Sequence, residues 1–295
     1  MAKKLMLILN PSAGLRAANR CLADIIGLFC AKDFMTTVFV TGKRGDATRW
    51  VEEYGAQYDI IACIGGDGTF NETLHGILES GIPAPIGYIP AGSTNDFANS
   101  LGLSLDVMEA AGEIAEGTPR PFDAGKFGSR HFSYVASFGA FTHASYSTPQ
   151  AVKNFLGHLA YILEGTRDLP YMKPEYIKLD ADGKIFEGDY LFGAVSNSTS
   201  LGGILTIDPS IVDMNDGKFE IMLIRPPETA ADLAEIMRAL TNRQYDCNMI
   251  DFASAGRITV LSNPEGGWSL DGEFEPGQDG VMIENLHSAV NLLCR

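Results

Sequence analysis

The chain has 295 residues and a formal net charge of -15 at pH 7, from 37 acidic and 22 basic side chains. This excess of acidic residues argues against a nucleic-acid partner, because binding a phosphate backbone requires clustered Lys and Arg, and the length allows about two domains of ~100 to 200 residues each. Five widely spaced cysteines without a CxxC pair disfavour a disulfide framework and a thiolate metal site, so a reducing cytoplasm is the expected location.

Roughly the first 120 residues alternate strand-like and helix-like patterns, which predicts βα units and a mostly parallel sheet. The expected buried strands are Leu5 to Leu9, Met35 to Val40, Asp59 to Ile64 and Pro85 to Ile89. The expected helices are Ala17 to Phe29, Asp46 to Tyr54, Phe70 to Glu79 and Asn95 to Ser100.

Three turns follow the first, third and fourth of these strands, and they are Asn10 to Gly14, Gly65 to Thr69 and Pro90 to Asp96. In open α/β sheets ligands bind at the carboxyl ends of the strands, where these turns would lie. Glycines let backbone N–H groups approach an anion, a helix N-terminus favours negative charge, and carboxylates between such turns favour a cation. The pattern therefore predicts a nucleotide site with magnesium. Each turn also has an ordinary interpretation, in which Asp96 caps its helix and Asp67 stabilises its own turn.

From about Lys126 the sequence changes to alternating apolar and polar runs, which predicts antiparallel strands in a second domain of sandwich type. These runs are His131 to Ser137, Tyr176 to Asp180, Ile185 to Val195, Phe219 to Ile224 and Ile258 to Leu261. Apolar residues at helical spacing predict two helices within this part, at Thr148 to Leu169 and Thr229 to Thr241.

Two acidic segments in the second half are ambiguous by themselves. Asp271 and Glu273 lie two residues apart on a turn that follows a strand-like stretch, where a solvated hairpin turn is the ordinary interpretation. The segment from Asp213 to Gly217 is either a β-turn or a magnesium or calcium corner in which carbonyl oxygens converge beside a carboxylate. Sequence spacing leaves both cases open.

Taken in order, the three glycine-containing turns, the Asn215 to Gly217 corner and the Leu270 to Glu273 segment resemble the bacterial diacylglycerol kinase family. These are soluble lipid kinases related to sphingosine kinases and more distantly to NAD kinases. The resemblance implies the two-domain NAD kinase/diacylglycerol kinase-like fold, with a Rossmann-like α/β nucleotide domain at residues 1–125. Residues 287–295 would return to that domain, and residues 126–286 would form an antiparallel β-sandwich that binds the lipid substrate.

The resemblance also assigns roles to residues of this chain. ATP would be held by residues of the first turns, by one threonine and by one serine, namely Asn10, Pro11, Ser12, Ala13, Gly14, Thr41, Gly66, Asp67, Gly68, Thr69, Phe70, Asn71, Glu72 and Ser93. Glu273 matches the family's general base, and Asp67 and Asp96 match acids that help organise the catalytic magnesium and its waters. Asp271 is assigned to the catalytic residues as well. A second, structural magnesium would be bound by the Asp216 carboxylate and by main-chain oxygens of Asp213 and Lys218.

The lipid acceptor is implied by a separate set of residues. The segments Thr142 to Pro149, Leu156 to Tyr161 and Leu169 to Lys173 are similar to the subgroup that converts diacylglycerol to phosphatidic acid. Two departures concern the acceptor domain: Gly139 to Thr142 lacks an acid that is frequent in the family, and Ile204 replaces a glycine.

The expected cellular location of the chain follows from the lipid acceptor and from the composition. No apolar run approaches the ~18 to 20 residues of a membrane span, so a soluble protein is expected that is peripheral at the inner membrane face during turnover. The helix at Thr148 to Leu169 would either touch the membrane transiently or pack on the sandwich core. A homodimer is suggested by analogy.

Three alternatives to a diacylglycerol kinase remain. The acceptor could be another lipid, such as a monoacylglycerol or a sphingoid base, or the chain could be an NAD kinase. A regulator that binds nucleotide or lipid without turnover would lack a base or metal carboxylate, but Asp67, Asp96, Asp271 and Glu273 are all present.

Overall fold

The structure is a computed structural model that describes residues 2–14, 17–93, 95–139, 173–201 and 205–295. The predicted helix at Thr148 to Leu169 lies outside the described residues, as do Ile204 and the segment from Thr142 to Pro149. The chain divides into two compact units, which we call unit 1 (residues 1–124 and 288–295) and unit 2 (residues 125–287).

Unit 1 contains a parallel sheet in the strand order β2-β1-β3-β4, with β18 next to β4. Its strands are β1 (Lys3–Leu9), β2 (Phe34–Val40), β3 (Ile60–Gly65), β4 (Ile86–Pro90) and the end of β18 (Met282–Cys294). Every residue of β3 and β4 is buried, as expected for strands covered on both faces. The predicted α/β architecture is confirmed. The prediction that Met35 to Val40 is a buried strand was wrong, because β2 lies at the edge of the sheet, where Met35 is 56% and Val40 52% exposed.

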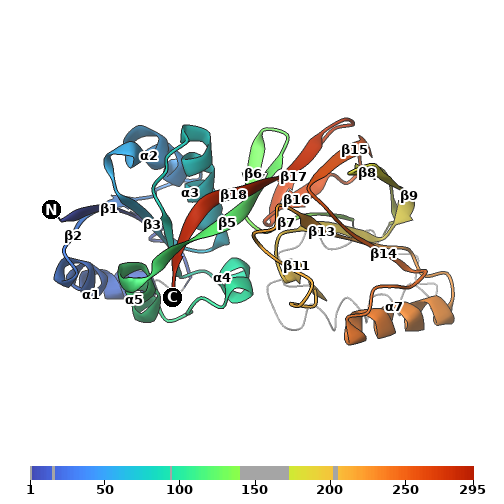
Figure 1. The fold of residues 1–295 in the computed structure, drawn as a ribbon, viewed down its shortest axis with the longest axis horizontal. Coiled ribbons are helices and arrows are strands. Elements are labelled where there is room, and N and C mark those ends of the chain that lie inside the picture. Colours follow the sequence, from blue (N-terminus) through green and yellow to red (C-terminus); the bar gives the residue numbers. More distant parts are fainter. Residues whose placement is uncertain (1, 15–16, 94, 140–172, 202–204) are drawn as a thin grey trace. The chain divides into compact units, whose positions relative to one another are not determined.

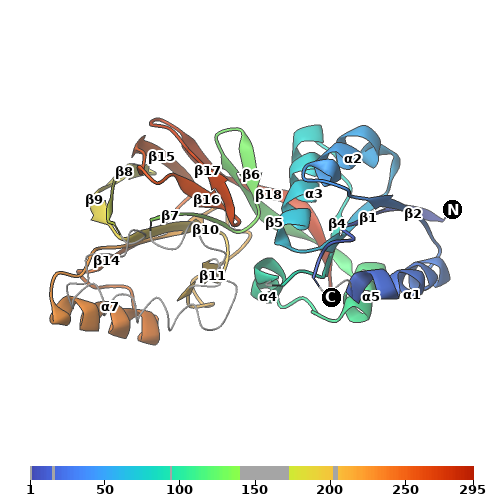
Figure 2. The same cartoon turned by 180° about the vertical axis from the view of Figure 1, so that it is seen from behind.

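Helices cover both faces of this sheet, with α2 and α3 on one side and α1 and α5 on the other (Figures 1 and 2). Their bounds are α1 (Ala17–Ala31), α2 (Asp46–Tyr54), the short 3-10 helix η1 (Gly55–Gln57), α3 (Asp67–Ser80), α4 (Asp96–Leu101) and α5 (Val107–Glu116). Sequence periodicity did not predict α5. Its start is fixed by Asp106, whose side chain accepts hydrogen bonds from the backbone N–H groups of Met108 and Glu109.

Two strands have residues in both units. β5 (Thr118–Phe127) passes from unit 1 to unit 2, and β18 returns from unit 2 to unit 1. The last residues of β18 pack in unit 1, where Leu293 belongs to the core that also contains Leu7, Ile64 and Ile114.

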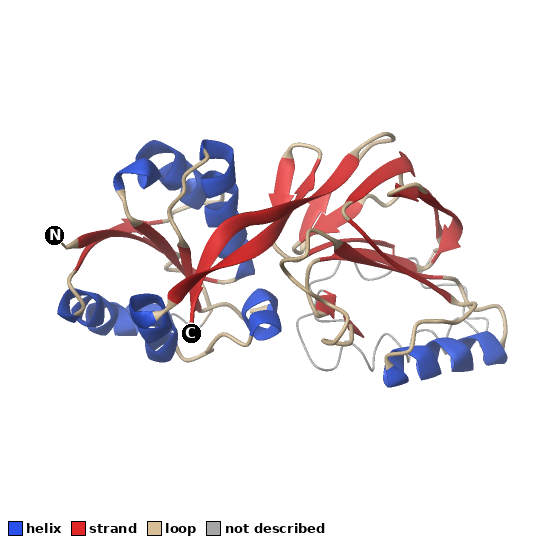
Figure 3. Ribbon diagram, viewed as in Figure 1, coloured by secondary structure: helices blue, strands red, loops and turns tan. Residues whose placement is uncertain are grey.

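Unit 2 is built from antiparallel sheets, and strands dominate it (Figure 3). One sheet has the order β14-β13-β10-β7-β16-β17, and the other continues from β18 through β15 and β8 to β9. The bounds are β6 (Arg130–Phe132), β7 (Val135–Gly139), β8 (Glu175–Ala181), β9 (Lys184–Tyr190), β10 (Phe192–Ser196), β11 (Ser200–Leu201), β12 (Leu205–Thr206), β13 (Phe219–Ile224), β14 (Ile250–Ala255), β15 (Arg257–Ser262), β16 (Trp268–Leu270) and β17 (Glu273–Glu275).

The core of unit 2 lies between these two sheets. Buried side chains from both meet in one cluster, for example Phe138, Ile221 and Trp268 from one sheet and Leu179 and Ile258 from the other. The predicted antiparallel sandwich is therefore confirmed. The predicted helix at Thr229 to Thr241 is confirmed as α7 (Ala230–Asn242), which begins with a capping box between Thr229 and Asp232.

Two runs of unit 2 were each predicted to form one continuous strand, and both predictions were wrong. The run from Ile185 to Val195 is split at Leu191, because β9 pairs with β8 in one sheet and β10 pairs with β13 in the other. The run from His131 to Ser137 is split between β6 and β7. The backbone N–H groups at this second break bond to the Asp271 side chain rather than to a neighbouring strand.

Candidate functional site

The three predicted turns converge at one edge of the unit 1 sheet, because β1, β3 and β4 are adjacent and parallel. The Asn10 side chain reaches the second turn, where its Nδ2 donates to Thr69 Oγ1 at 3.0 Å. The second turn is joined to the third, since the Ala91 N–H donates to the Gly65 carbonyl at 2.7 Å. Three segments that are distant in sequence thus form one surface.

Glycines allow the backbones of these turns to approach closely. A Cβ added to Gly14, whose φ is +52°, would lie 2.4 Å from the Ala91 carbonyl oxygen. One added to Gly92 would lie 2.6 Å from the Cα of Gly66. No larger residue fits at these positions, so the surface is made of backbone, with the N-terminus of α3 beside it. Such a surface suits a phosphate group.

Asp67 links the second turn to the start of α4. Its carboxylate accepts hydrogen bonds from the backbone N–H groups of Asp96 at 3.1 Å and Phe97 at 3.3 Å. The Tyr88 hydroxyl donates to it at 3.5 Å. Asp67 therefore caps α4 from a different helix. Burial nevertheless raises the pKa of Asp67, and the hydrogen bonds oppose this shift.

Asp96 lies beside Asp67, and the two carboxylates are electrostatically coupled. Burial and, as the smaller cause, the negative charge of Asp67 together raise the pKa of Asp96 to about 6. Two such carboxylates favour a bound cation, because a divalent ion would remove both their repulsion and their poor solvation. The structure thus brings together two of the four predicted catalytic acids in a setting that fits a metal ion.

The remaining residues of the α3 turn divide into exposed and buried groups. Gly68 is exposed beside Asp67, whereas Thr69, Phe70 and Asn71 are buried. The Phe70 ring stacks on Phe97 with 4.2 Å between the ring centroids. Phe70 therefore holds α3 against α4 rather than presenting a surface to a ligand.

Glu72 organises the loop that follows Thr41. Its carboxylate accepts hydrogen bonds from the Gly45 N–H at 2.8 Å and the Ala47 N–H at 3.3 Å, at the start of α2. The Thr41 hydroxyl is 3.4 Å from the Leu9 carbonyl oxygen, which ties that loop to the end of β1. Glu72 and Thr41 thus shape the edge of the site.

The first and third turns contribute exposed or half-buried residues. In the first turn the Ser12 N–H donates to Asn10 Oδ1 at 3.0 Å, and Pro11 and Ala13 flank Ser12 with partial exposure. In the third turn Ser93 is exposed, and its neighbour Thr94 lies outside the described residues.

Asp271, in unit 2, is 7% exposed, and its carboxylate is hydrogen-bonded to donors of the protein itself. Its carboxylate accepts hydrogen bonds from the Ser133 hydroxyl at 2.7 Å and from the backbone N–H groups of Ser133, Tyr134 and Val135. Burial raises its pKa to about 6, although these hydrogen bonds lower it. Through these hydrogen bonds Asp271 fixes the position of the turn that carries Glu273.

Glu273 is held by an arginine that the sequence analysis did not single out. Arg130 Nη2 donates to Glu273 Oε2 at 2.8 Å, and Nη1 donates to Glu275 Oε2 at 3.0 Å and to the Phe274 carbonyl at 3.0 Å. The guanidinium therefore fixes all three residues of β17. The Arg130 and Glu273 side chains remain 30% and 28% exposed, so solvent or a ligand can reach the pair.

The predicted metal corner around Asp216 is a compact turn in unit 2. Asp216 Oδ1 accepts the Lys218 N–H at 2.9 Å, and Asp213 Oδ1 accepts the Asn215 N–H at 3.0 Å. The Lys218 carbonyl accepts a hydrogen bond from Asn285 Nδ2 at 2.9 Å. This bond leaves a second lone pair on that carbonyl oxygen. Both aspartates are exposed, so the carboxylate and carbonyl oxygens present suit Mg²⁺.

Comparison with known proteins decides the family. Residues 4–127 match the family model of the diacylglycerol kinase catalytic domain. A diacylglycerol kinase of Bacillus subtilis strain 168 is 32% identical over 97% of this chain and 95% of its own length. The chain belongs to the diacylglycerol kinase family. Another relative with that name, from Staphylococcus saprophyticus, is 32% identical over 93% of this chain and 90% of its own.

A solved structure agrees over the whole chain. The structure of a diacylglycerol kinase from Bacillus anthracis strain Sterne is similar with a TM-score of 0.78 at 27% identity, covering 99% of this chain and 97% of that one. The predicted two-domain fold and the predicted lipid kinase are confirmed by these comparisons. As a member of this kinase family, the protein is an ATP-dependent lipid kinase, a class of enzyme that typically uses a divalent metal.

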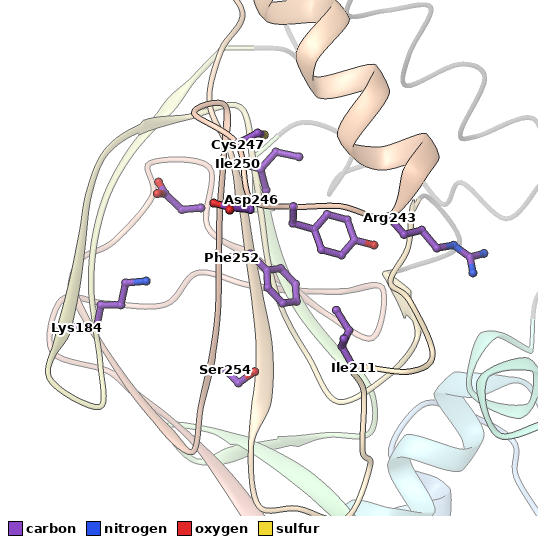
Figure 4. A pocket seen from close by; sticks show the side chains of 10 residues that line it. Lys184, Ile211, Arg243, Asp246, Cys247, Ile250, Phe252 and Ser254 are labelled. Carbon is purple, nitrogen blue, oxygen red and sulfur yellow. The ribbon is translucent and has the colours of Figure 1, made fainter.

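A hollow in unit 2 is a separate feature of this diacylglycerol kinase family member. Its volume is about 640 Å³, and it lies along β14, where Phe252 and Ser254 form part of its wall (Figure 4). Lys184 and Arg243 lie on opposite sides of it, so its two cations do not converge on one anion. Two acids, Asp246 and Asp251, also line the hollow.

One buried acid was recognisable in the sequence but was not identified by the motifs. Glu220 is an acid within the apolar run from Phe219 to Ile224, and it is 2% exposed. Arg130 offered no such signal, since its role depends on pairing with residues far along the chain.

Proposed function

We propose that this lipid kinase transfers the γ-phosphate of ATP to the free hydroxyl of diacylglycerol, which gives phosphatidic acid. The observation that carries the phosphate-transfer part is the glycine-rich surface of unit 1 with its coupled pair, Asp67 and Asp96. The acceptor is proposed from the names of the relatives, which are called diacylglycerol kinases and align with nearly the whole chain.

The backbone of unit 1 binds the ATP phosphates in this proposal. The N–H groups of Gly14, Gly66, Gly68 and Ser93 would donate to the phosphate oxygens, and the N-terminus of α3 adds a favourable dipole. Phosphoryl transfer depends mainly on positioning and on neutralising charge, so such a surface supplies much of the catalysis. Thr41 and Glu72 set the conformation of the neighbouring loop.

Asp67 and Asp96 would hold Mg²⁺ in this site. Bound Mg²⁺ supplies neutralisation of the phosphate charge, which is the chemistry that a kinase requires of its metal. Asp67 has a double task, because the same carboxylate caps α4 and so fixes the position of Asp96. The structural Mg²⁺ is proposed separately, at the Asp216 carboxylate and the main-chain oxygens of Asp213 and Lys218.

Glu273 is the proposed general base, which accepts the proton of the lipid hydroxyl as that hydroxyl attacks phosphorus. A positioned base typically contributes ~10² to 10⁴-fold to the rate. Arg130 holds the Glu273 carboxylate in one orientation, and Asp271 holds the turn on which it stands. Both are positioning residues rather than groups that touch the substrate.

Contact with a membrane follows from the acceptor. No described helix is both long and apolar enough to cross a bilayer. Because diacylglycerol resides in bilayers, we propose that the enzyme meets it at the membrane surface for the time of turnover. The homodimer suggested by the family resemblance stays a prediction.

An acceptor panel tests the proposed function. Mixed micelles containing diacylglycerol, monoacylglycerol, ceramide and sphingosine would be incubated with ATP and Mg²⁺, with NAD as a soluble acceptor, and the products identified by mass spectrometry. Phosphatidic acid is the expected main product. Phosphate transfer to a different lipid alone would overturn the acceptor assignment, and transfer to NAD would overturn the lipid kinase assignment as well.

A further inference from the structure

The outer edge of β2 is an open strand edge of unit 1. β2 is the end strand of its sheet (Figure 1), and among the described strands it pairs with β1 alone. Met35, Thr37 and Val40 are exposed along it. Such an edge presents a row of backbone N–H and C=O groups that can pair with another strand.

Folded proteins usually protect such edges with charged side chains, prolines, bulges or very short strands. The other end strands of the two large sheets follow this rule: β9 contains Lys184 and Glu187, β14 contains Asp251, and the three-residue β17 contains two glutamates. β2 has seven residues without a charge or a proline, and its register with β1 continues over all of them without a bulge. β2 is therefore the end strand best suited to pairing.

The side chains of β2 alternate between the two helix layers. The Phe39 ring faces α2, where its centroid lies 5.5 Å from that of a tyrosine ring, and the Phe34 ring faces α1, 6.0 Å from a phenylalanine ring. Since side chains alternate along a strand, Met35 shares the face of Phe39, and Val40 shares the face of Phe34. Each face thus carries one aromatic ring and one exposed aliphatic side chain, at opposite ends of the strand.

An antiparallel pair of two β2 strands brings these groups together. In the register centred on Thr37, Met35 of one copy lies opposite Phe39 of the other, and Val40 lies opposite Phe34. Residues directly opposite each other share a face, with their Cβ atoms about 4.5–5.5 Å apart. Contacts of methionine sulfur with aromatic rings are favourable. The pairing therefore covers both exposed aliphatic side chains.

The charges beside β2 favour the same orientation. Asp33 precedes the strand and Lys43 follows it, and both are exposed. Antiparallel pairing places Asp33 of each copy within two positions of Lys43 of the other, whereas parallel pairing would bring like charges together. Lys32 does not cancel this effect, because it is paired with Glu116 of its own chain at 2.8 Å.

We propose that two copies of this chain associate through β2, in an antiparallel pair whose two-fold axis passes at Thr37. The sheets of the two copies of unit 1 then join into one sheet. The contact is closed after two copies, because the pairing uses the edge of both. A membrane fits this edge poorly, since open backbone N–H and C=O groups find no partners in lipid. The family resemblance suggests a homodimer but no surface for it, and β2 supplies that surface.

The molar mass of the full chain in solution tests the surface. Light scattering coupled to size-exclusion chromatography should give about twice 31.8 kDa for the wild type. Thr37→Lys places two like charges opposite each other at the axis and should give the mass of one chain. Ile185→Lys is the matched control, because it adds the same charge at a 49% exposed position of β9, the other end strand of the same sheet, and should remain dimeric. Circular dichroism checks that both variants are folded.

Cysteine cross-linking tests the register. In a Cys30→Ser background, which removes an exposed thiol, Thr37→Cys should form a disulfide between copies under mild oxidation, because the two side chains meet at the axis. Met35→Cys is the register control. Its counterpart lies four residues along the partner strand, ~13 Å away at about 3.3 Å per residue, so it should not cross-link.

Different results would overturn different parts of the proposal. A wild type with the mass of one chain at every concentration would overturn the association. A dimer that persists in Thr37→Lys, or that is lost equally in Ile185→Lys, would remove β2 from the interface. Cross-linking of Met35→Cys as readily as Thr37→Cys would overturn the antiparallel register. None of these results bears on the proposed kinase reaction, which the acceptor panel tests.

Discussion

The acidic residues of the two units are treated differently by the protein around them. In unit 1, Asp67 and Asp96 lie side by side; burial raises both pKa values, and the negative charge of Asp67 contributes to the shift at Asp96. In unit 2, Asp271 accepts four hydrogen bonds and Glu273 is ion-paired with Arg130. Asp67 accepts backbone hydrogen bonds from the start of α4, yet both acids of the first pair keep raised pKa values, whereas Glu273 of the second pair is ion-paired with Arg130. We propose that this difference separates acids that bind a metal ion from acids that are held in position.

The largest expected effect comes from removing a charge in unit 1. Asp67→Asn should lower kcat/KM by ~10² to 10³-fold, because an oriented electrostatic group near the transferring phosphate is lost. The required Mg²⁺ concentration should also rise. The asparagine side-chain oxygen can still accept from the α4 N-terminus, so the Tm in EDTA should change little. A large drop in that Tm would assign Asp67 a structural role instead.

In unit 2 the corresponding change is the loss of the arginine that holds the base. Arg130→Met should lower kcat by ~10 to 100-fold, because a misplaced catalytic group loses its alignment with the substrate. KM for ATP should not change. Arg130→Lys keeps one charged donor and should recover part of the rate. An ATP KM that rises with no loss of kcat would show that Arg130 serves nucleotide binding and not Glu273.

Replacing a buried acid by asparagine should change the free energy of unfolding in opposite directions in the two units. Asp271→Asn leaves backbone N–H groups facing an amide NH₂ in a buried site, so unfolding free energy should fall by about 1–3 kcal/mol. Chemical denaturation measures this loss. A stability equal to that of the wild type would mean that the turn before Glu273 does not depend on Asp271.

Asp96→Asn should have the opposite effect on the metal-free enzyme. The pKa of Asp96 is raised on folding from 3.8 to about 6, so the folded state binds this proton more tightly than the unfolded state does. Its contribution to stability is therefore favourable at low pH and is lost as pH rises through about 6. At pH 8 the variant should be more stable than the wild type by about 1–3 kcal/mol, and at pH 4 the difference should shrink. Denaturation in EDTA at both pH values tests this sign, and a variant less stable at pH 8 would contradict it.

The fold was largely predictable because its signals are local. The buried strands of unit 1 are short apolar runs, and turn residues mark their ends. Helix α5 was missed because the buried face includes Ala110 and Ala111, which give a weak hydrophobic period. The break between β6 and β7 was missed because it depends on Asp271, which is far away in sequence.

The candidate site was predictable in its motifs but not in its supporting contacts. Turns after neighbouring parallel strands must meet, so the grouping of Asn10, Gly66 and Gly92 follows from the strand pattern. The pairing of Arg130 with Glu273 could not be predicted, since the two residues are far apart in the sequence and no repeating pattern connects them. Glu220 was visible as an acid in an apolar strand, but the burial of its side chain became evident only from the structure.

Binding and turnover measured separately in two variants test the central claim most directly. Affinity for Mg²⁺ and ATP would be determined by calorimetry, and phosphatidic acid formation by single-turnover kinetics, for Asp96→Asn and Glu273→Gln. Asp96→Asn should lose metal-dependent nucleotide affinity. Glu273→Gln should bind Mg²⁺ and ATP like the wild type, and its turnover should be lower by ~10²-fold or more. Equal losses of nucleotide affinity in both variants, or near-normal turnover by Glu273→Gln, would contradict the division of labour between the two units.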